Sequence, residues 1–215
     1  MVSMACLVFM ANAKAGVVAE VIIGNLSTFP TSASGSYTVG YDGLLGFSSS
    51  SIAYGFTMGE QSYSVGSVVL QLNYYNTDAD VADTRIGIFA DDGGKPGSTL
   101  IGSYLTNPAS ASGENDFTFT AVDVTLAAGT RYWLVASAEN TSSFAWEAGD
   151  ATLAPSGIGA TDYGMQLNTG LGWSSGNDSR AALEINAVPE PSTWAFTLFG
   201  LTALAAFLKR RPAQA

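Results

Sequence analysis

The sequence predicts an all-β protein, an antiparallel β-sandwich of the jelly-roll type followed by a single C-terminal hydrophobic helix. Short runs of β-favouring residues recur between clusters of Gly, Ser, Asn, Asp and Pro. Only 12% of the residues are charged and 24 are glycine, which suits short strands and tight turns better than long helices. No segment between these runs is long enough for a crossover helix, so a parallel βαβ architecture is excluded.

Single strands are predicted from the alternation of apolar and polar side chains, because successive residues of a strand point to opposite faces. In Val68–Tyr74 every second residue is large and apolar, and Tyr132–Ala136 alternates in the same way. Each of these strands is therefore expected to bury one face. Trp133 lies between two apolar residues of the second run, and we interpret it as a core residue.

A further alternating pattern runs through the middle of the chain. Phe117 and Phe119 occupy every second position, and Val122–Leu126 repeats the pattern with Val122, Val124 and Leu126. Ala121 stands between the two halves and predicts a bulge or a change of register. About ten strands of this kind can be counted, and no period of a repeat protein recurs among them.

The first residues resemble the rear half of a signal peptide. A short apolar run, Met4–Met10, precedes the small-residue patterns Ala11-Asn12-Ala13 and Ala13-Lys14-Ala15. Because no Lys or Arg precedes Lys14, the basic region of such a signal is missing, and we expect the true start codon to lie upstream. Residues 1–19 are accordingly interpreted as a truncated signal peptide, with an ordinary buried first strand as the alternative.

The C-terminal segment, residues 187–215, combines three physical features in a fixed order. It begins with Val188, Pro189, Glu190 and Pro191, whose prolines prevent a preceding strand from continuing and keep the chain extended. An apolar stretch, Ala195–Leu208, follows directly after Trp194. Counted from Trp194 this stretch would form a helix of about 22 Å, which is short for a hydrocarbon core of about 30 Å.

A basic cluster closes the chain and predicts its orientation. The cluster consists of Lys209, Arg210 and Arg211. By the positive-inside rule it would hold the end of the helix in the cytoplasm and leave everything before Pro189 outside. The predicted signal peptide agrees with this orientation, so residues 20–186 are expected to form an extracellular domain.

The Val-Pro-Glu-Pro segment, the apolar helix and the basic end together resemble a PEP-CTERM sorting signal. The resemblance implies recognition by an exosortase, a membrane transpeptidase-like enzyme of Gram-negative bacteria that produce exopolysaccharide. It also implies that Pro189, Glu190 and Pro191 form the recognition site and are substrate residues rather than catalysts. A plain transmembrane anchor stays open as the alternative.

Three segments of the middle region carry a second resemblance. They are Ala53–Gly59, the glycine-rich strand and turn Arg85–Gly97, and Tyr132–Val135. Together they resemble the choice-of-anchor extracellular domains, most closely the R type. This resemblance implies a location at the cell surface but supplies neither an activity nor a catalytic set.

Composition excludes several classes of function. The net charge is −10, so the surface repels phosphate backbones, and nucleic acid is excluded as a partner. The chain contains no histidine, which excludes Ser-His-Asp and Cys-His catalysis and His-ligated zinc. We expect no enzymatic activity. The rival is a carboxylate-dependent glycan-cleaving enzyme, for which Glu60, Glu139, Glu147 and Asp150 are available, although their spacing singles out no pair.

Two binding sites are considered. Asp78, Asp80 and Asp83 cluster three carboxylates that could gather Ca²⁺, with a solvated acidic loop as the favoured alternative. Asp91 and Asp92 are interpreted as turn residues. Aromatic rings can stack on sugars, and the candidates are three residues in turn-rich stretches: Trp146, Tyr163 and Trp173.

The function predicted from these observations is that of an exported protein without a required cofactor. We expect an inner-membrane intermediate whose domain lies outside the cytoplasm, processing by the exosortase, and delivery to the cell surface or the extracellular matrix. The sandwich would make adhesive or structural contacts, including contacts with extracellular polysaccharide. The first alternative is a carbohydrate-binding module.

Overall fold

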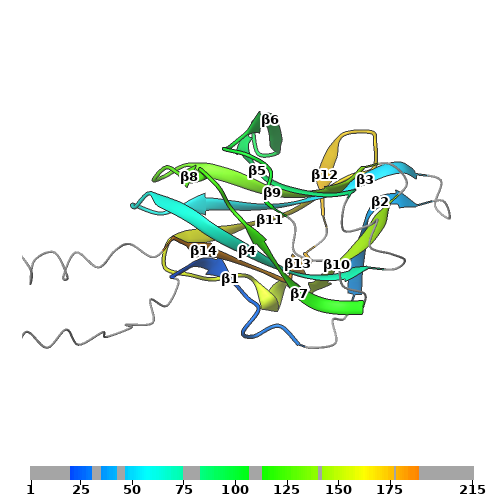
Figure 1. The fold of residues 1–215 in the computed structure, drawn as a ribbon, viewed down its shortest axis with the longest axis horizontal. Helices are drawn as coiled ribbons and strands as arrows, with labels where there is room; N and C mark the ends of the chain where they lie inside the picture. Colours follow the sequence, from blue (N-terminus) through cyan, green and yellow to red (C-terminus); the bar gives the residue numbers. More distant parts are fainter. Residues whose placement is uncertain are drawn as a thin grey trace, which may run out of the picture.

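The computed structural model describes residues 20–30, 35–42, 47–74, 83–106, 113–139, 142–176 and 178–188. These residues form fourteen β-strands and one short 3-10 helix (Figure 1). The elements of the first half are β1 (Val21–Gly24), β2 (Gly35–Asp42), β3 (Phe47–Met58), β4 (Tyr63–Tyr74), β5 (Thr84–Asp91), β6 (Pro96–Leu100) and β7 (Gly113–Thr120). Those of the second half are β8 (Thr125–Leu126), β9 (Arg131–Ala138), β10 (Ser143–Gly149), η1 (Ala151–Leu153), β11 (Ala160–Asn168), β12 (Trp173–Ser175), β13 (Arg180–Ala181) and β14 (Leu183–Ala187).

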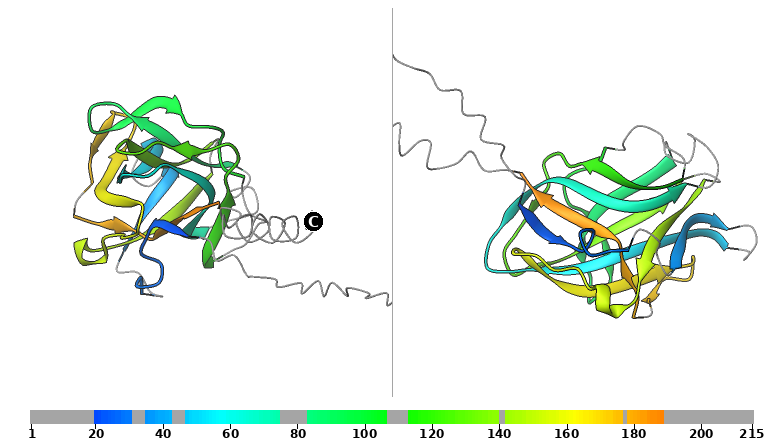
Figure 2. Two further views of the ribbon diagram at one scale, coloured as in Figure 1. Left: turned by 90° about the vertical axis from the view of Figure 1, so that its left-hand side faces the viewer. Right: turned by 90° about the horizontal axis from the view of Figure 1, so that it is seen from below.

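The strands form two antiparallel layers that face each other, as the views of Figures 1 and 2 show. Sheet I contains the row β2-β10-β4-β7, with β14 and then β1 beside β4 and with the short strands β8 and β13 at its ends. Sheet II contains the row β12-β11-β3-β9-β5-β6. Along β2, β3, β4, β5, the chain alternates between the two sheets, so a long connection between parallel strands is never needed.

The two sheets are joined where β2 pairs with β3. The paired positions lie near the start of β3, at Gly40 with Ser50 and at Asp42 with Phe47. The rest of β3 leaves sheet I and pairs with β9 on one side and β11 on the other. The predicted all-β antiparallel sandwich is confirmed by this arrangement.

The core fills the space between the sheets. Val68, Leu70 and Leu72 of β4 are completely buried, as the alternation of the sequence predicted. From sheet II, Leu134 and Ala136 of β9 meet them in the same cluster. The outward-facing residues of β9 are buried as well, which the prediction of one buried face per strand missed, because part of the outer face of sheet II is covered.

The region around Ala121 separates two strands rather than bending one. Strand β7 ends at Thr120 and β8 begins at Thr125, so the predicted irregularity is a short connection. Val124 is buried as predicted, but Val122 is 51% exposed and does not join the core. The physical reason is the connection itself, which includes Asp123 at a φ of +55° and breaks the alternation.

The predicted membrane helix cannot be placed in this fold. The segment Ala195–Leu208 lies outside the described residues, as do residues 1–19. Within the part of the chain that the structure describes, no helix is long and apolar enough to cross a membrane.

Candidate functional site

The described part of the domain ends within the first residues of the predicted sorting segment. Strand β14 reaches Ala187, and the next backbone N–H, that of Val188, donates to the carbonyl oxygen of Ser64 over 2.7 Å. Pro189, Glu190 and Pro191 follow directly and lie outside the described residues, as does the basic cluster Lys209–Arg211. The candidate recognition site therefore begins where the sheet ends.

The two ends of the domain meet at one pole of the sandwich. Strand β1 pairs with β14 in antiparallel fashion, and the N–H of Ala187 donates to the carbonyl oxygen of Glu20 over 2.9 Å. Asn25 holds the opposite end of this strand pair, because its Nδ2 donates to the carbonyl oxygens of Leu153 and Ala181 over 2.8 and 2.9 Å. Figure 2 shows β1 and β14 side by side.

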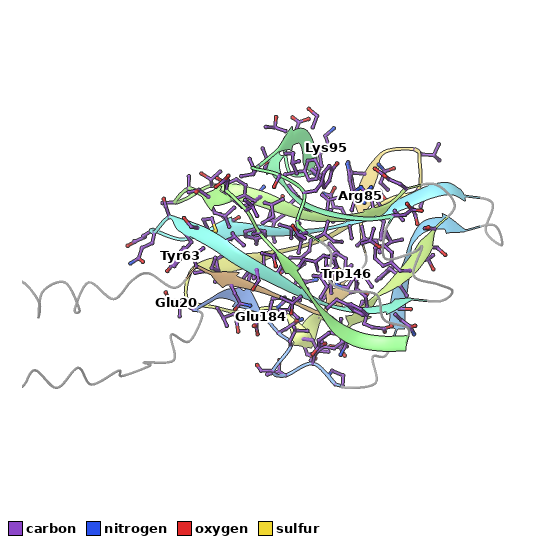
Figure 3. All side chains as sticks on the ribbon, viewed as in Figure 1. Glu20, Tyr63, Arg85, Lys95, Trp146 and Glu184 are labelled. Carbon is purple, nitrogen blue, oxygen red and sulfur yellow. The ribbon has the colours of Figure 1, made fainter. Side chains whose placement is uncertain are left out.

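The pole is acidic. One cavity of about 360 Å³ is lined by Glu20, Glu60 and Ile158, among others, and a second of about 360 Å³ by Glu20, Glu184 and Ile158. Neither lining includes a Lys or Arg. Figure 3 shows Glu20 and Glu184 at this end, while Lys95 lies on the far side of sheet II.

A second candidate region lies on the outer face of sheet II, and we call it the outer-face cluster (Trp133, Asp91, Arg131, Tyr163, Trp173). Its centre is Trp133 on β9, which pairs with Gly55 of β3 and Phe89 of β5. A Cβ at Gly55 would lie 2.7 Å from the Trp133 indole, so only glycine lets the ring lie over β3. Trp133 is 1% exposed, in agreement with its interpretation as a core residue.

The glycine-rich turn covers Trp133 and bonds to it. The indole Nε1 donates to Oδ1 of Asp91 over 2.7 Å, and the N–H of Gly94 donates to Oδ2 of the same carboxylate over 3.1 Å. Gly93 and Gly94 have φ values of +62° and +88°, as a type I′ hairpin turn requires at both central positions. Asp91 therefore acts as a turn residue and also as the acceptor for Trp133.

Tyr163 forms the exposed rim of the cluster. Its ring meets Trp133 edge to face with centroids 5.5 Å apart, and the Arg131 guanidinium lies 3.5 Å from its centroid. Tyr163 remains 43% exposed. The half-buried Trp173 packs against the buried group to which Trp133 belongs. Two of the three predicted sugar-stacking residues, Tyr163 and Trp173, thus lie on the same outer face, and the Arg131 cation holds the Tyr163 ring in place.

The three segments with the second resemblance also meet in this cluster. They form β3, the β5–β6 hairpin and β9, which are adjacent in sheet II. The contribution of Arg131 and Asp91 was missed from the sequence. The only sequence signal for them is their position beside Trp133 and the glycine-rich turn.

Comparison with known families identifies the C-terminal segment. Residues 187–211 match the PEP-CTERM protein-sorting motif. This match confirms the predicted sorting signal, which is the signal of proteins exported and sorted to the cell surface as exosortase substrates. No curated protein and no solved structure matches the chain.

The prediction for Trp146 is wrong. Trp146 lies in the middle of β10, is completely buried, and donates from Nε1 to the carbonyl oxygen of Ala182 over 3.0 Å. Its ring therefore has no surface to offer to a sugar. The residues around it looked turn-rich because β10 is short and ends at Gly149, directly before Asp150, but the strand is held between β2 and β4.

The calcium prediction stays a prediction. Asp78 and Asp80 lie outside the described residues. Asp83 is described, and its Oδ2 accepts a hydrogen bond from the Ser142 hydroxyl over 2.9 Å. Among the described residues, no group of three or more Asp, Glu or Cys side chains could hold a metal ion.

The four carboxylates considered for glycan cleavage lie in separate environments. Glu60 is exposed at the acidic pole, Glu139 pairs with Arg85 over 2.7 Å, and Glu147 is buried in β10. Asp150 caps η1 and accepts from both the hydroxyl and the N–H of Thr152. The hydrogen bond from the Thr152 hydroxyl has the larger effect and that from the Thr152 N–H the smaller, and both lower the pKa of Asp150. A carboxyl group with a lowered pKa is a poor general acid.

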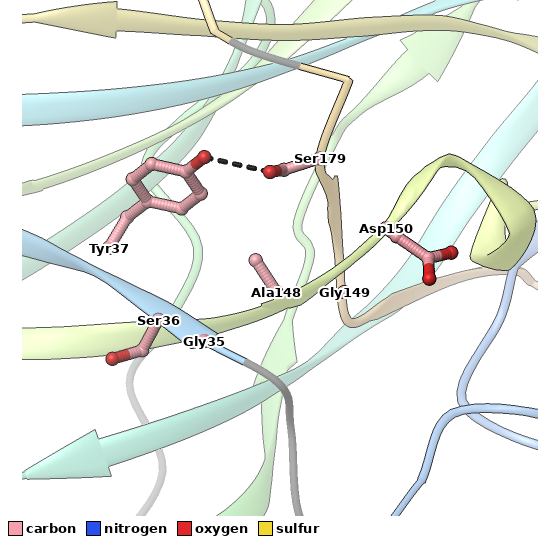
Figure 4. Close-up of a pocket in the computed structure, with 7 residues that line it drawn as sticks. All are labelled: Gly35, Ser36, Tyr37, Ala148, Gly149, Asp150 and Ser179. Carbon is pink, nitrogen blue, oxygen red and sulfur yellow. Dashed lines mark hydrogen bonds between the residues drawn. The ribbon is translucent and has the colours of Figure 1, made fainter.

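Asp150 also lines a cavity of about 330 Å³ between the start of β2 and the end of β10 (Figure 4). Tyr37 and Ser179 lie across from it, and the Tyr37 hydroxyl donates to Oγ of Ser179 over 2.8 Å. The lining carries hydroxyl groups and one carboxylate, and the only aromatic ring in it is that of Tyr37. It therefore lacks the paired aromatic surfaces of the outer-face cluster.

Proposed function

We propose that this is an exported protein, sorted by an exosortase to the cell surface or into exopolysaccharide, whose β-sandwich makes adhesive or structural contacts. The observation that carries the proposal is the PEP-CTERM motif at residues 187–211, which begins on the last residue of β14. Sorting signals of this kind act on an accessible segment, and the last described backbone hydrogen bond before the motif's Pro-Glu-Pro residues is the one that Val188 donates to Ser64.

The intermediate in this proposal is held in the inner membrane by residues 194–208, with the basic cluster in the cytoplasm. Because β1 and β14 are neighbours, a signal peptide before Glu20 and a membrane helix after Pro191 leave the domain at the same pole. That pole would face the membrane, and the outer-face cluster would lie on a side of the domain that is free for contacts.

We further infer that the fold is a jelly roll of the choice-of-anchor type. Support for the jelly roll comes from the two four-strand rows β2-β10-β4-β7 and β3-β9-β5-β6, which the chain visits in the alternating manner of two Greek keys. Support for the choice-of-anchor relationship comes from the three resembling segments, which build one shared cluster in sheet II.

The test is fractionation of cells that produce the full chain, with and without their exosortase. Sorting by this signal predicts a shortened chain at the cell surface when the enzyme is present. Without the enzyme, the full-length chain should stay in the inner membrane. A Glu190→Gln variant tests recognition of the motif, and Glu60→Gln at the acidic pole is the matched control. Identical fractions in both strains would contradict the proposal.

A second candidate function, carbohydrate binding, is favoured by the outer-face cluster. Tyr163 and Trp173 present aromatic surface beside Trp133, and Arg131 and Asp91 add polar groups at the same place. Rings of this kind can stack on the CH groups of sugars while polar neighbours fix the orientation. An uncharged or weakly charged polysaccharide suits an acidic protein better than a polyanion.

Binding of the purified mature protein to the producer's exopolysaccharide tests this candidate. Tyr163→Ala and Trp173→Ala should each weaken binding several-fold while lowering the thermal unfolding temperature by only a few degrees. Tyr104→Ala is the matched control, because Tyr104 is also exposed, at 48%, but lies outside the cluster. Equal losses for all three variants would argue against a specific site.

We also propose that the domain is not an enzyme. Support comes from the absence of histidine and from the structural partners of Glu139 and Asp150. Incubation with the producer's polysaccharide should therefore release no reducing ends, whereas release that is lost in Glu60→Gln or Glu147→Gln would overturn this proposal.

Addition of EDTA to the binding assay tests the calcium prediction at Asp78, Asp80 and Asp83.

A further inference from the structure

Two cations of the described domain lie on the outer side of sheet II without a carboxylate partner. Of the four basic residues that the structure describes, Arg85 and Arg180 each pair with a carboxylate over 2.7 Å. Arg131 and Lys95 pair with no carboxylate among the described residues. Arg131 belongs to the outer-face cluster, and Figure 3 shows Lys95 on the same side of the sandwich. This side therefore carries the cations that a ligand can reach.

Arg131 presents a guanidinium whose position is fixed. It lies on β9 and points to the same face as Trp133, because residues two apart on a strand share a face. Its Cζ is 3.5 Å from the centroid of the Tyr163 ring, and its Nε donates to Oγ1 of Thr57 over 3.4 Å. Its two Nη groups donate to no acceptor in the described part of the chain. One edge of the fork is therefore left to bind an anion.

A bulge in β11 aims Tyr163 at Arg131. The register between β11 and β3 shifts between Asp162 and Gly164, so Tyr163 is the extra residue of the bulge. Asp162 fixes this irregularity, because its Oδ1 accepts from the N–H of Gly164 over 2.9 Å and its Oδ2 accepts from Nε of Arg180 over 2.7 Å. The guanidinium covers one face of the Tyr163 ring, so the ring and the cation hold each other in place.

The glycine-rich turn brings the second cation to the same place. Gln166 of β11 donates from Nε2 to the carbonyl oxygen of Gly94 over 2.6 Å, which ties the turn to the strand that carries Tyr163. A Cβ at Gly94 would lie 3.0 Å from the Tyr163 hydroxyl. Lys95 is the next residue and is exposed. Its long side chain adds a second positive charge near the fixed charge of Arg131.

The other described surfaces attract an anion less. Outward positions of sheet I hold acids such as Asp116 on β7 and Glu184 on β14. The acidic pole lies away from Lys95, as Figure 3 shows for Glu20. Exposed charges act mainly within a Debye length of about 8 Å at physiological salt, so the local cations can bind a single anionic group although the whole chain is acidic.

We propose that the outer-face cluster binds a carboxylate-bearing sugar, a uronic acid residue of the extracellular polysaccharide, and that Arg131 determines this specificity. The guanidinium fork matches a planar carboxylate through two parallel hydrogen bonds. The half-buried Trp173 offers apolar surface to the sugar ring. Single uronic acids spaced along a weakly charged polymer suit a site with two cations. This inference rests on the carbohydrate-binding candidate and adds the chemical class of its ligand.

The producer's exopolysaccharide in its native and its carboxyl-reduced form provides the matched pair of probes. Reduction turns each uronic acid into the corresponding neutral sugar and keeps the rings and linkages. The full chain, purified in mild detergent, should bind the native polymer about ten-fold or more tightly than the reduced one. Equal binding of both forms, or binding to a polymer without uronic acid, would overturn the inference and leave carbohydrate binding intact. Binding to neither form would overturn the carbohydrate-binding candidate together with the inference.

Variants of the two arginines locate the contact. Arg131→Gln should weaken binding to the native polymer about ten-fold or more and leave binding to the reduced polymer nearly unchanged. Arg131→Lys keeps the charge but not the fork, so it should recover only part of the loss. Arg85→Gln is the matched control, because Arg85 is already paired with Glu139, and it should leave the affinity nearly unchanged. Equal losses in Arg131→Gln and Arg85→Gln would show unspecific attraction and overturn the inference.

Two further variants test how the site is held and charged. Tyr163→Phe keeps the ring beside Arg131 and should bind like the parent chain, whereas Tyr163→Leu should bind several-fold more weakly. Equal binding of Tyr163→Phe and Tyr163→Leu would contradict the positioning of Arg131 by this ring. Asp92 is exposed in the same turn and repels an anion, so Asp92→Asn should strengthen binding to the native polymer. Weaker binding of Asp92→Asn would contradict the charge argument.

Discussion

Trp146 and Trp133 are both buried, but their burial has different origins. Trp146 lies between the two sheets, where packing of sheet on sheet removes it from water, and it bonds to a backbone carbonyl. Trp133 lies on the outer face of sheet II, where a hairpin turn and the β11–β12 region cover it, and it bonds to a carboxylate. The inner core therefore depends on the whole sandwich, whereas the outer-face cluster is a local unit that a loop holds together.

The largest expected effect is on the inner core. Trp146→Ala would leave a cavity between the sheets and should lower the free energy of unfolding by about 3–5 kcal/mol. For a domain of this size the thermal midpoint should fall by about 10 °C. Thermal unfolding followed by circular dichroism measures the shift, and a fall of only a few degrees would mean that Trp146 is not part of the global core.

A smaller effect is expected when the same residue type is altered in the outer-face cluster. Trp133→Phe keeps an aromatic ring but removes the donor to Asp91, which should cost about 1–3 kcal/mol. Combining Trp133→Phe with Asp91→Ala should cost less than the sum of the single changes, because both remove the same hydrogen bond. Strict additivity in denaturant unfolding would show that the bond contributes nothing.

The difference between the two tryptophans also explains what the sequence could predict. Alternation in β4 and β9 correctly placed the inner core, since the period of two follows directly from strand geometry. It failed in β10, where Ala145, Glu147 and Gly149 are buried on the opposite face and hide the alternation. A Cβ on Gly149 would meet Leu153 of the following 3-10 helix and Phe29 from a distant part of the chain, and both cover this face.

Prediction of the candidate sites was limited for the same reason. The sorting motif is a continuous segment and was readable from residue order alone. The outer-face cluster draws its residues from β5, β9, β11 and β12 around Gly55 of β3, so its partners become neighbours only through strand order. Tyr163 and Trp173 were named as candidates by residue type, but nothing local pairs Arg131 with Tyr163 or Asp91 with Trp133.

A change in the turn that covers Trp133 should have an effect of about 1 kcal/mol. Gly94→Ala places a side chain at a φ of +88°, which L-residues adopt at a cost of about 1–2 kcal/mol, and its Cβ would lie 3.0 Å from the Tyr163 hydroxyl. Gly129→Ala is the matched control, since its φ is +64° and it has no neighbour within 4 Å. A loss no larger for Gly94→Ala than for this control in chemical unfolding would show that the Tyr163 contact has no energetic weight.

The last prediction concerns the pH dependence of stability that Tyr54 contributes, which has almost no effect near neutral pH. Tyr54 connects the two regions. Tyr54 is buried in the inner core, and its hydroxyl donates to Oδ1 of Asp162 over 2.8 Å, next to Tyr163 of the outer-face cluster. Burial, and then the Asp162 charge, raise the pKa of Tyr54 above its ordinary value of 10.0. The unfolded chain can lose this proton above about pH 10 while the folded chain keeps it, so stability is fully present below that pH and falls above it.

The expected slope is up to about 1.4 kcal/mol for each pH unit above the unfolded pKa. Tyr54→Phe removes this group and should flatten the alkaline limb relative to the parent chain, although it also loses the hydrogen bond to Asp162 at every pH. Phe119→Leu alters another completely buried ring that carries no ionisable group, so it is the matched control and should leave the slope unchanged. Denaturant unfolding between pH 8 and pH 11 measures how the free energy of unfolding changes with pH in each variant. Equal alkaline slopes in the parent chain and Tyr54→Phe would contradict a buried, protonated Tyr54.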